Sequence, residues 1–230
     1  MPTLLITGAN RGIGLALAQQ YLEADWQVVA TCRNPDNAHE LSQLASDYDS
    51  LSIESLEVTQ ASAIDSLVTS LDGRPVDILI NNAGVYGQSN NDFGNTNTEQ
   101  WLNALNINTI APLKIMEALA ENIAASEKRI IASMSSKMGS MDDNGSGGSY
   151  VYRSTKAALN AIMVSAAHDL KPRGITAIIL HPGWVRTDMG GPNGEISTAE
   201  SATQLRNILA KVSLENAGDF YDIDGSIIPW

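Results

Sequence analysis

The chain has 230 residues, of which 43% are hydrophobic and 17% are charged. This balance is typical of a globular protein with a full hydrophobic core rather than of a disordered chain. Its 26 acidic and 14 basic side chains give a formal net charge of −12. Because a negative surface repels phosphate backbones and anionic lipid headgroups, we expect neither a nucleic-acid partner nor a membrane partner.

The single cysteine, Cys32, permits no intrachain disulfide and no cysteine-rich zinc site. The first residues lack the basic region and the apolar stretch of a secretory signal. No apolar run approaches the roughly 18 residues of a membrane span. We therefore expect a cytoplasmic protein without a metal site.

Short aliphatic runs alternate with segments of helical apolar spacing along the whole chain. The predicted strands are Thr3–Thr7, Gln27–Cys32, Leu51–Leu56, Val76–Asn81, Arg129–Ser133, Ile175–Leu180 and, more weakly, Asp219–Ile223. Because right-handed crossovers return the chain to the start of each next strand, this alternation predicts a parallel sheet with helices on both faces. We expect one α/β domain over residues 1–230, with a doubly wound parallel sheet of about seven strands.

A glycine-rich turn follows the first predicted strand and precedes a helix. Gly8, Gly12 and Gly14 stand where the backbone must turn sharply and lie against a ligand. The helix that follows points free N–H groups and a positive dipole end at this turn, which suits a pyrophosphate. A plain glycine-rich turn is the alternative, and the strand before and the helix after argue against it.

The spacing of these glycines resembles the T-G-x-x-x-G-x-G pattern of the short-chain dehydrogenase/reductase family. The resemblance implies a Rossmann fold, a nicotinamide dinucleotide cofactor and oxidoreductase activity. Asn81, Asn82, Ala83 and Gly84, after the fourth predicted strand, resemble a second signature of that family, whose small residues let the cofactor approach the backbone.

The second predicted strand carries no acidic residue at its tip, where an acid would bind the ribose 2′-hydroxyl of NAD. Cys32 stands there and Arg33 follows, while Arg11 lies inside the glycine turn. Two arginines close to a 2′-phosphate would form charge-assisted hydrogen bonds with it. We therefore expect NADPH or NADP rather than NAD, the alternative being that both arginines are simply solvated. Glu57 and Val58 stand where the family usually has Asp-Val beside the adenine.

Tyr152 and Lys156 are four residues apart in a predicted helix and so share one face of it. A phenol of pKa near 10 is a poor acid–base group at neutral pH until a neighbouring ammonium favours its phenolate. By itself this spacing also describes an ordinary surface pair. The family resemblance makes Tyr152 the catalytic acid–base group and Lys156 its partner, which also binds the nicotinamide ribose.

The resemblance adds two polar residues to the catalytic set. Ser136, after the fifth predicted strand, matches the family's serine, and the spacing to Tyr152 is about three residues longer than usual; Ser135 is the alternative. Asn108, inside the helical segment 105–119, matches the asparagine that holds a water for the proton relay, and Asn106 competes with it.

After the sixth predicted strand, residues 181–189 resemble the family's Pro-Gly segment, in which a backbone group and a threonine hydroxyl contact the nicotinamide carboxamide. Val185 and Thr187 fill those places, and His181 is expected to be structural. The resemblance thus predicts a cofactor site formed by Gly8, Asn10, Arg11, Gly12, Ile13, Gly14, Arg33, Glu57, Val58, Asn82, Ala83, Gly84, Tyr152, Lys156, Pro182, Gly183, Val185 and Thr187.

Several longer segments resemble the subgroup of the bacterial C-factor and the insect carbonyl reductase sniffer, and this likeness spans essentially the whole chain. In that subgroup the substrate loop, here about residues 186–198, is short, which implies an open substrate cleft. The residues expected to line it are Ser136, Tyr152, Tyr86, Met138, Met141, Trp184 and Met189.

The resemblance therefore predicts an NADPH-dependent carbonyl reductase that transfers hydride to an aldehyde or ketone, with Tyr152 as proton donor. The alternative is a signalling or regulatory protein of C-factor type that binds the cofactor with little or no turnover. The presence of Asn108, Ser136, Tyr152 and Lys156 together favours the enzyme. Relatives pair through the helices that carry Asn108 and Tyr152, so we expect a homodimer or homotetramer.

Overall fold

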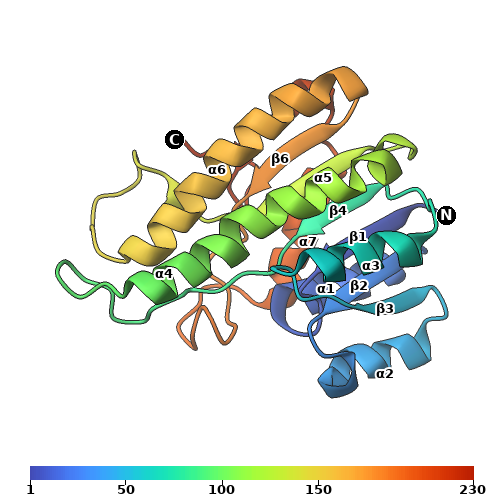
Figure 1. The fold of residues 1–230 in the computed structure, drawn as a ribbon, viewed down its shortest axis with the longest axis horizontal. Coiled ribbons are helices and arrows are strands. Elements are labelled where there is room, and N and C mark those ends of the chain that lie inside the picture. The colour runs from blue at the N-terminus through green and yellow to red at the C-terminus, as the bar shows by residue number, and fades with distance from the viewer.

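A single seven-stranded sheet forms the centre of the computed structural model, which describes residues 1–230 (Figure 1). The strand order is β3-β2-β1-β4-β5-β6-β7, and every neighbouring pair is parallel. The strands are β1 (Thr3–Thr7), β2 (Gln27–Cys32), β3 (Leu51–Ser55), β4 (Ile78–Asn81), β5 (Ile130–Met134), β6 (Thr176–Leu180) and β7 (Phe220–Tyr221). The predicted doubly wound parallel sheet of about seven strands is confirmed.

The edge strand β7 is shorter than the predicted Asp219–Ile223. Only Phe220 and Tyr221 pair with β6. The next N–H group, that of Asp222, donates instead to the carbonyl of Ser226, so the chain turns away from the sheet. A local turn therefore ends the strand where hydrophobic pattern alone would continue it.

Seven α-helices cover the two faces of the sheet. They are α1 (Gly12–Leu22), α2 (His39–Asp47), α3 (Ala61–Leu71), α4 (Thr98–Leu105), α5 (Ala111–Ala124), α6 (Tyr150–Leu170) and α7 (Thr198–Leu209). Helices α1, α2 and α7 contribute to the core on one face, and α3, α5 and α6 to the core on the other. Successive strand residues supply opposite faces: Leu4 and Ile6 belong to the first core and Leu5 to the second.

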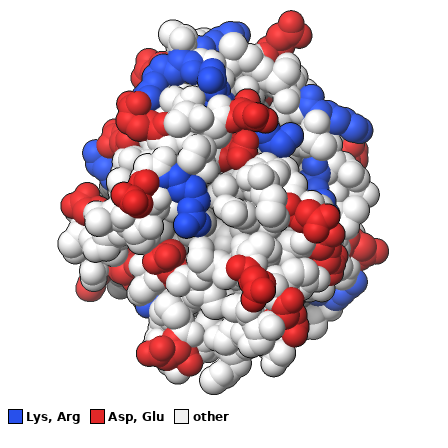
Figure 2. Space-filling view, turned by 90° about the vertical axis from the view of Figure 1, so that its right-hand side faces the viewer, with Lys and Arg blue, Asp and Glu red and all other residues white.

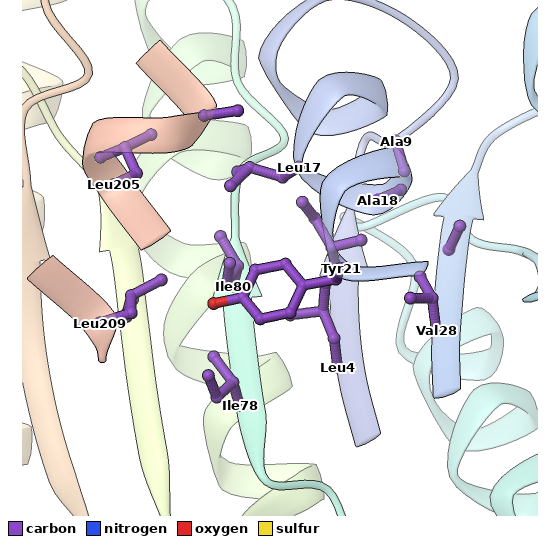
Figure 3. Packing of buried hydrophobic residues seen from close by; sticks show 14 of the residues in the cluster. Leu4, Ala9, Leu17, Ala18, Tyr21, Val28, Ile78, Ile80, Leu205 and Leu209 are labelled. Atoms are coloured by element: carbon purple, nitrogen blue, oxygen red, sulfur yellow. The ribbon is translucent and has the colours of Figure 1, made fainter. Parts of the chain in front are cut away.

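Figure 3 shows how the first of these cores is filled. Leu17 and Tyr21 of α1 and Leu205 and Leu209 of α7 point toward the aliphatic side chains of β1 and β4. This packing fixes α1 against the sheet and so sets the position of the glycine turn at its start.

Helices α4 and α5 form one nearly continuous run beside α6 (Figure 1). They are joined by a π-helical turn, Asn106–Ile110, in which the N–H of Ala111 donates to the carbonyl five residues back, on Asn106. The single helix expected over 105–119 therefore contains one wider turn. Such turns are rare and are often found at functional sites; here the turn contains the buried residue Asn108.

No helix is both long enough and apolar enough to cross a membrane. The face of the molecule drawn in Figure 2 carries acidic and basic side chains interspersed with each other, without a continuous basic surface.

Close backbone packing joins the end of β5 to α6. Gly139, in the short helical turn Lys137–Gly139, lies so near α6 that an added Cβ would be 2.8 Å from the carbonyl carbon of Lys156. The backbone of α6 cannot move away without disturbing the whole helix. Glycine at this position therefore allows the segment after β5 to contact the first turns of α6.

We predict that Gly139→Ala lowers the free energy of unfolding by about 1–3 kcal/mol, the usual range for overpacking a closely packed site. Gly145→Ala is the matched control, because a Cβ there would meet nothing within 4 Å; we expect it to change stability by less than about 0.5 kcal/mol. Urea denaturation of the two variants measures both effects. Equal stabilities would show that the backbone contact at Gly139 is not tight.

Candidate active site

Tyr152 and Lys156 lie one turn apart near the start of α6, and both are buried, with 9% and 5% of their surface exposed. The Nζ of Lys156 is 5.7 Å from the centre of the Tyr152 ring. It donates a hydrogen bond of 2.7 Å to the carbonyl oxygen of Met134, the last residue of β5. Their burial distinguishes the two residues from a surface pair of the same spacing.

Burial dominates the acid–base properties of this pair. It raises the pKa of Tyr152 to about 12. The hydrogen bond with Ser136 lowers this pKa, and Tyr86 raises it by a smaller amount. Burial lowers the pKa of Lys156 to about 8. The expectation that the lysine charge would favour the phenolate is thus not what the structure shows, because desolvation of the phenol outweighs the opposing effects. Tyr152 is protonated at neutral pH, the form that can donate a proton.

The structure distinguishes between the two candidate serines. The hydroxyl of Ser136 hydrogen-bonds the phenol of Tyr152 and also accepts from the backbone N–H of Met138 at 3.2 Å. Ser135, by contrast, is buried and its hydroxyl donates to Oδ1 of Asn160 on α6. Ser136 therefore lies beside Tyr152, although it is not among the residues that line the cavity described below. Ser135 lines that cavity and also joins β5 to α6.

Asn108 joins three segments of the chain. Its Nδ2 donates to the carbonyl of Val85 at 2.8 Å and to Oγ1 of Thr155 at 3.0 Å, and its Oδ1 accepts from the N–H of Val85 at 2.8 Å. Both amide hydrogens are therefore used within the chain. The competing residue, Asn106, begins the π turn, and its carbonyl accepts the N–H of Ala111.

The glycine turn is built for close approach of a ligand to the backbone. Gly8 and Gly12 have φ values of +66° and +60°, in the left-handed region that favours glycine. A Cβ on Gly14 would collide with the carbonyl oxygen of Gly8 and lie 2.6 Å from Nδ2 of Asn82. That amide nitrogen also donates to the carbonyls of Thr7 and Gly8, which fixes the turn against the end of β4.

A cavity of about 740 Å³ extends from this turn to Tyr152 and Lys156, a size within the usual range for small-molecule sites. Most of the predicted cofactor residues line it: Gly8, Asn10, Arg11, Gly12, Ile13, Gly14, Arg33, Glu57, Val58, Asn82, Ala83, Gly84, Tyr152, Lys156, Pro182 and Thr187. Gly183 and Val185 do not line it. Val185 is buried and forms an isolated β-bridge with Ile196, and a Cβ on Gly183 would also meet Ile196.

The two predicted phosphate-binding arginines both lie on the wall of this cavity. Arg11 forms an exposed ion pair with Asp188, from the segment after β6. Arg33 makes no ion pair within the chain and is exposed. No acidic residue stands at the tip of β2, where Cys32 is buried. This combination of the glycine turn, the helix N-terminus and two arginines fits a dinucleotide with an additional phosphate.

The sequence profile of the short chain dehydrogenase family matches residues 2–196 of the chain. The chain belongs to this family. Its relatives include C-signal of Myxococcus xanthus, which is 38% identical over 156 residues that cover 68% of this chain and 93% of that protein.

Two solved structures of carbonyl reductases resemble the whole chain. One is the carbonyl reductase Sniffer of D. melanogaster, with a TM-score of 0.93, 33% identity and full coverage of both chains. The other is the NADPH-bound carbonyl reductase from chicken fatty liver, with a TM-score of 0.91, 34% identity and coverage of 100% of this chain and 99% of that one. The family resemblance inferred from the motifs is confirmed.

The predicted substrate residues of this short-chain dehydrogenase are less closely grouped than the cofactor residues. Met189 lines the cavity, and Trp184, half exposed, donates its indole N–H to the carbonyl of Gly190. Tyr86 stacks on Tyr152 rather than lining the cavity. Met138 is half-buried after β5, and Met141 is 73% exposed, so the structure does not bring these two into the cavity wall.

Sequence reasoning missed several lining residues of the cavity. These are Leu15, Ala16, Gln19, Cys32, Glu40, Leu56, Val85, Ile107 and Met134. Ser135, the predicted alternative to Ser136, also lines the cavity, as do Arg186, Asp188 and Thr198 of the predicted substrate loop. Leu56 and Met134 lie at or just beyond the carboxyl ends of strands, the edge at which ligands bind in sheets of this kind. Their positions in the strand pattern were therefore a usable signal, whereas no local pattern marks Ile107, which reaches the cavity from the π turn.

His181, just after β6, is a structural residue with an unusual environment. Burial lowers its pKa to about 4, although Asp222 acts in the opposite direction; Asp143 also raises the pKa and Lys137 lowers it. Its Nδ1 is buried without a hydrogen-bond partner. His181 is therefore neutral at pH 7.

We predict that the free energy of unfolding falls by roughly 2 kcal/mol between pH 6.5 and pH 4 because of His181. In this window the unfolded chain binds a proton at His181 and the folded chain does not, so stability is lost as pH falls. Urea denaturation over this range should give a flatter curve for His181→Gln. His168→Gln, at an exposed position of α6, is the control and should leave the curve unchanged; equal slopes in all three proteins would contradict the prediction.

Proposed function

We propose that this short-chain dehydrogenase is an NADPH-dependent carbonyl reductase that reduces an aldehyde or ketone, with Tyr152 as proton donor. The observation that carries the proposal is the buried, protonated phenol of Tyr152, on which Ser136 acts. It lies at one end of a cavity, and the glycine turn lies at the other end. The two similar solved structures described above are carbonyl reductases, one of them bound to NADPH.

Different residues of the chain would bind the different parts of the cofactor. The glycine turn and the start of α1 would hold the pyrophosphate, Lys156 the nicotinamide ribose, and Arg11 and Arg33 the 2′-phosphate. Bound NADPH would supply the hydride. The remaining steps are proton transfer and charge stabilisation, which belong to side chains of the protein.

Tyr152 and Ser136 would act together on the carbonyl oxygen of the substrate. The hydroxyl of Ser136 acts on the phenol of Tyr152 from close by, so that one substrate oxygen between them could accept a hydrogen bond from both. As negative charge develops on that oxygen, Ser136 stabilises it and Tyr152 transfers its proton. Both residues are buried, which strengthens these interactions because little water competes for them. With a raised pKa, Tyr152 is protonated at neutral pH, which is the form that reduction needs.

A signalling protein that binds the cofactor without turnover is the second candidate function. One relative is named C-signal, and its similarity covers two thirds of this chain. A cofactor sensor has no need of a phenol and a serine hydroxyl aimed at the same point. The hydrogen-bonded pair of Tyr152 and Ser136 therefore supports the reductase.

We predict that Tyr152→Phe lowers kcat for carbonyl reduction by at least about 100-fold, the lower range for loss of a general acid. NADPH affinity should stay within about twofold, because the ring and Lys156 remain. The measurement is the loss of NADPH absorbance with a panel of aldehydes and ketones. Tyr150→Phe, two residues earlier and partly exposed, is the matched control and should retain activity. Turnover by Tyr152→Phe at the wild-type rate would exclude the proposed mechanism.

We predict that Arg11→Ala and Arg33→Ala each weaken NADPH binding by about 10-fold and NADH binding much less. The basis is the loss of a charge-assisted hydrogen bond at an exposed position, worth about 1.5 kcal/mol. Fluorescence titration with both cofactors measures the ratio of dissociation constants. Asp188→Asn, which removes the ion-pair partner of Arg11, serves as a companion variant and should not weaken NADPH binding. Equal losses for both cofactors would show that neither arginine contacts the 2′-phosphate.

We also propose that the chain forms a homodimer or homotetramer in the cytoplasm. Two apolar side chains, Leu102 of α4 and Ile110 of the π turn, are 62% and 47% exposed on the helical run beside α6. Contact between copies through this face would bury them. A free, buried Cys32 and the absence of disulfides suit a reducing compartment.

A further inference from the structure

Three consecutive residues after β4 contact the neighbouring helical segments: Val85 contacts the π turn, and Tyr86 and Gly87 contact the start of α6. Both backbone polar groups of Val85 hydrogen-bond the amide of Asn108. The ring of Tyr86 stacks on the ring of Tyr152, with centres 4.8 Å apart and planes 23° from parallel. Gly87, with φ +80°, packs so closely that a Cβ would lie 2.7 Å from Cγ1 of Val151. The segment is therefore fixed on both sides of the stacked ring.

The hydroxyl of Tyr86 adds a further constraint. It shares a hydrogen bond of 2.8 Å with Oγ of Ser149, the residue immediately before α6. Ser149 has φ +50°, an unfavourable value for a residue other than glycine, and its side chain makes no capping hydrogen bond to the helix. Tyr86 therefore contacts Tyr152 through its ring and holds the approach to α6 through its hydroxyl.

The stack restrains a side chain whose orientation decides proton transfer. Ser136 contacts the phenol of Tyr152 at its hydroxyl, and Lys156 lies 5.7 Å from its ring centre. Tyr86 is the aromatic group that lies along the ring itself. Stacking of this kind stabilises a pair beyond simple burial and also defines the angle between the rings.

We propose that Tyr86 is a positioning residue, which holds the ring of Tyr152 in the orientation needed to protonate the substrate, and that Asn108 acts partly through Val85 to keep Tyr86 in place. This inference rests on the proposed reductase function and replaces the expectation that Tyr86 lines the substrate cleft. The two roles differ in their kinetics. A lining residue changes KM and the choice of substrate, whereas a positioning residue changes kcat for every substrate.

The first experiment compares Tyr86→Leu and Tyr86→Phe with the wild-type protein in steady-state reduction of a small aliphatic aldehyde and of an aromatic ketone. Tyr86→Leu removes the stack and should lower kcat by about 10- to 100-fold for both substrates, the effect expected of a misplaced catalytic group. KM and the dissociation constant of NADPH should stay within about twofold. Tyr86→Phe keeps the stack and should recover most of kcat.

The second experiment measures the ionisation of Tyr152 without turnover. Phenolate absorbance is titrated for Tyr86→Leu with and without the additional change Tyr152→Phe. The difference between the two titration curves is the titration of Tyr152. The same two curves are recorded for Tyr86→Phe. Lys156, Tyr86 and Ser136 are the polar or titratable groups beside this phenol. We expect Tyr152 to ionise at lower pH in the protein with Tyr86→Leu than in the one with Tyr86→Phe, because water reaches the unstacked ring and desolvation then raises the pKa less. The charge of an ionised Tyr86 is absent from both variants and so does not contribute to this difference.

Several outcomes would overturn the inference. A wild-type kcat in Tyr86→Leu, or a rise in KM confined to one substrate, would make Tyr86 a substrate-lining residue. Identical kcat losses in the leucine and phenylalanine variants, or identical titrations of Tyr152, would exclude a role for the stack. If Tyr86→Leu does not fold, Tyr86→Met takes its place. Failure of the proposed function is recognised separately, since the wild-type protein would then reduce no carbonyl while the titration still tests the stack.

Discussion

The candidate site depends on a buried ammonium group. Lys156 is almost fully buried, and removing an ammonium from water costs several kcal/mol unless it finds polar partners. The carbonyl of Met134 supplies one partner, so the carboxyl end of β5 must lie directly against α6. Gly139 permits that approach, and the hydrogen bond between Ser135 and Asn160 holds it. The position of Ser136 beside Tyr152 follows from the same contact.

The π turn between α4 and α5 has a comparable role on the other side of α6. It contains Asn108, a buried residue whose amide hydrogen-bonds Val85 and Thr155. A π turn contains one residue more than a regular helical turn, so the side chains around Asn108 would point in other directions if the helix were regular. The irregular turn therefore connects the segment after β4 with α6, and Tyr86 lies in that segment. Two separate connections, from β5 and from β4, thus meet at the first turns of α6.

The sequence predicted the sheet well because each strand is a short aliphatic run between helical segments. It also predicted the glycine turn, since the φ values of Gly8 and Gly12 are ones that few other residues adopt. The family resemblance favoured Ser136, but the strand pattern alone left Ser135 open as the alternative, because adjacent residues after a strand can face opposite sides. The π turn was not predicted either, although Pro112, which has no N–H group to donate to the carbonyl four residues back, stands just after it and marks an irregular helix.

The electrostatics of the pair required the three-dimensional structure. From spacing alone, Lys156 was expected to favour the phenolate of Tyr152, but the degree of burial reverses the outcome for the phenol. Lowering the pKa of a lysine from 10.5 to about 8 makes the folded state less stable at neutral pH by about 3 kcal/mol relative to an unperturbed lysine. The two large cores on the faces of the sheet offset that cost. The burial that makes Lys156 costly for the folded state is the same burial that keeps the neighbouring phenol of Tyr152 protonated. A protonated phenol is the form that can donate a proton to a carbonyl.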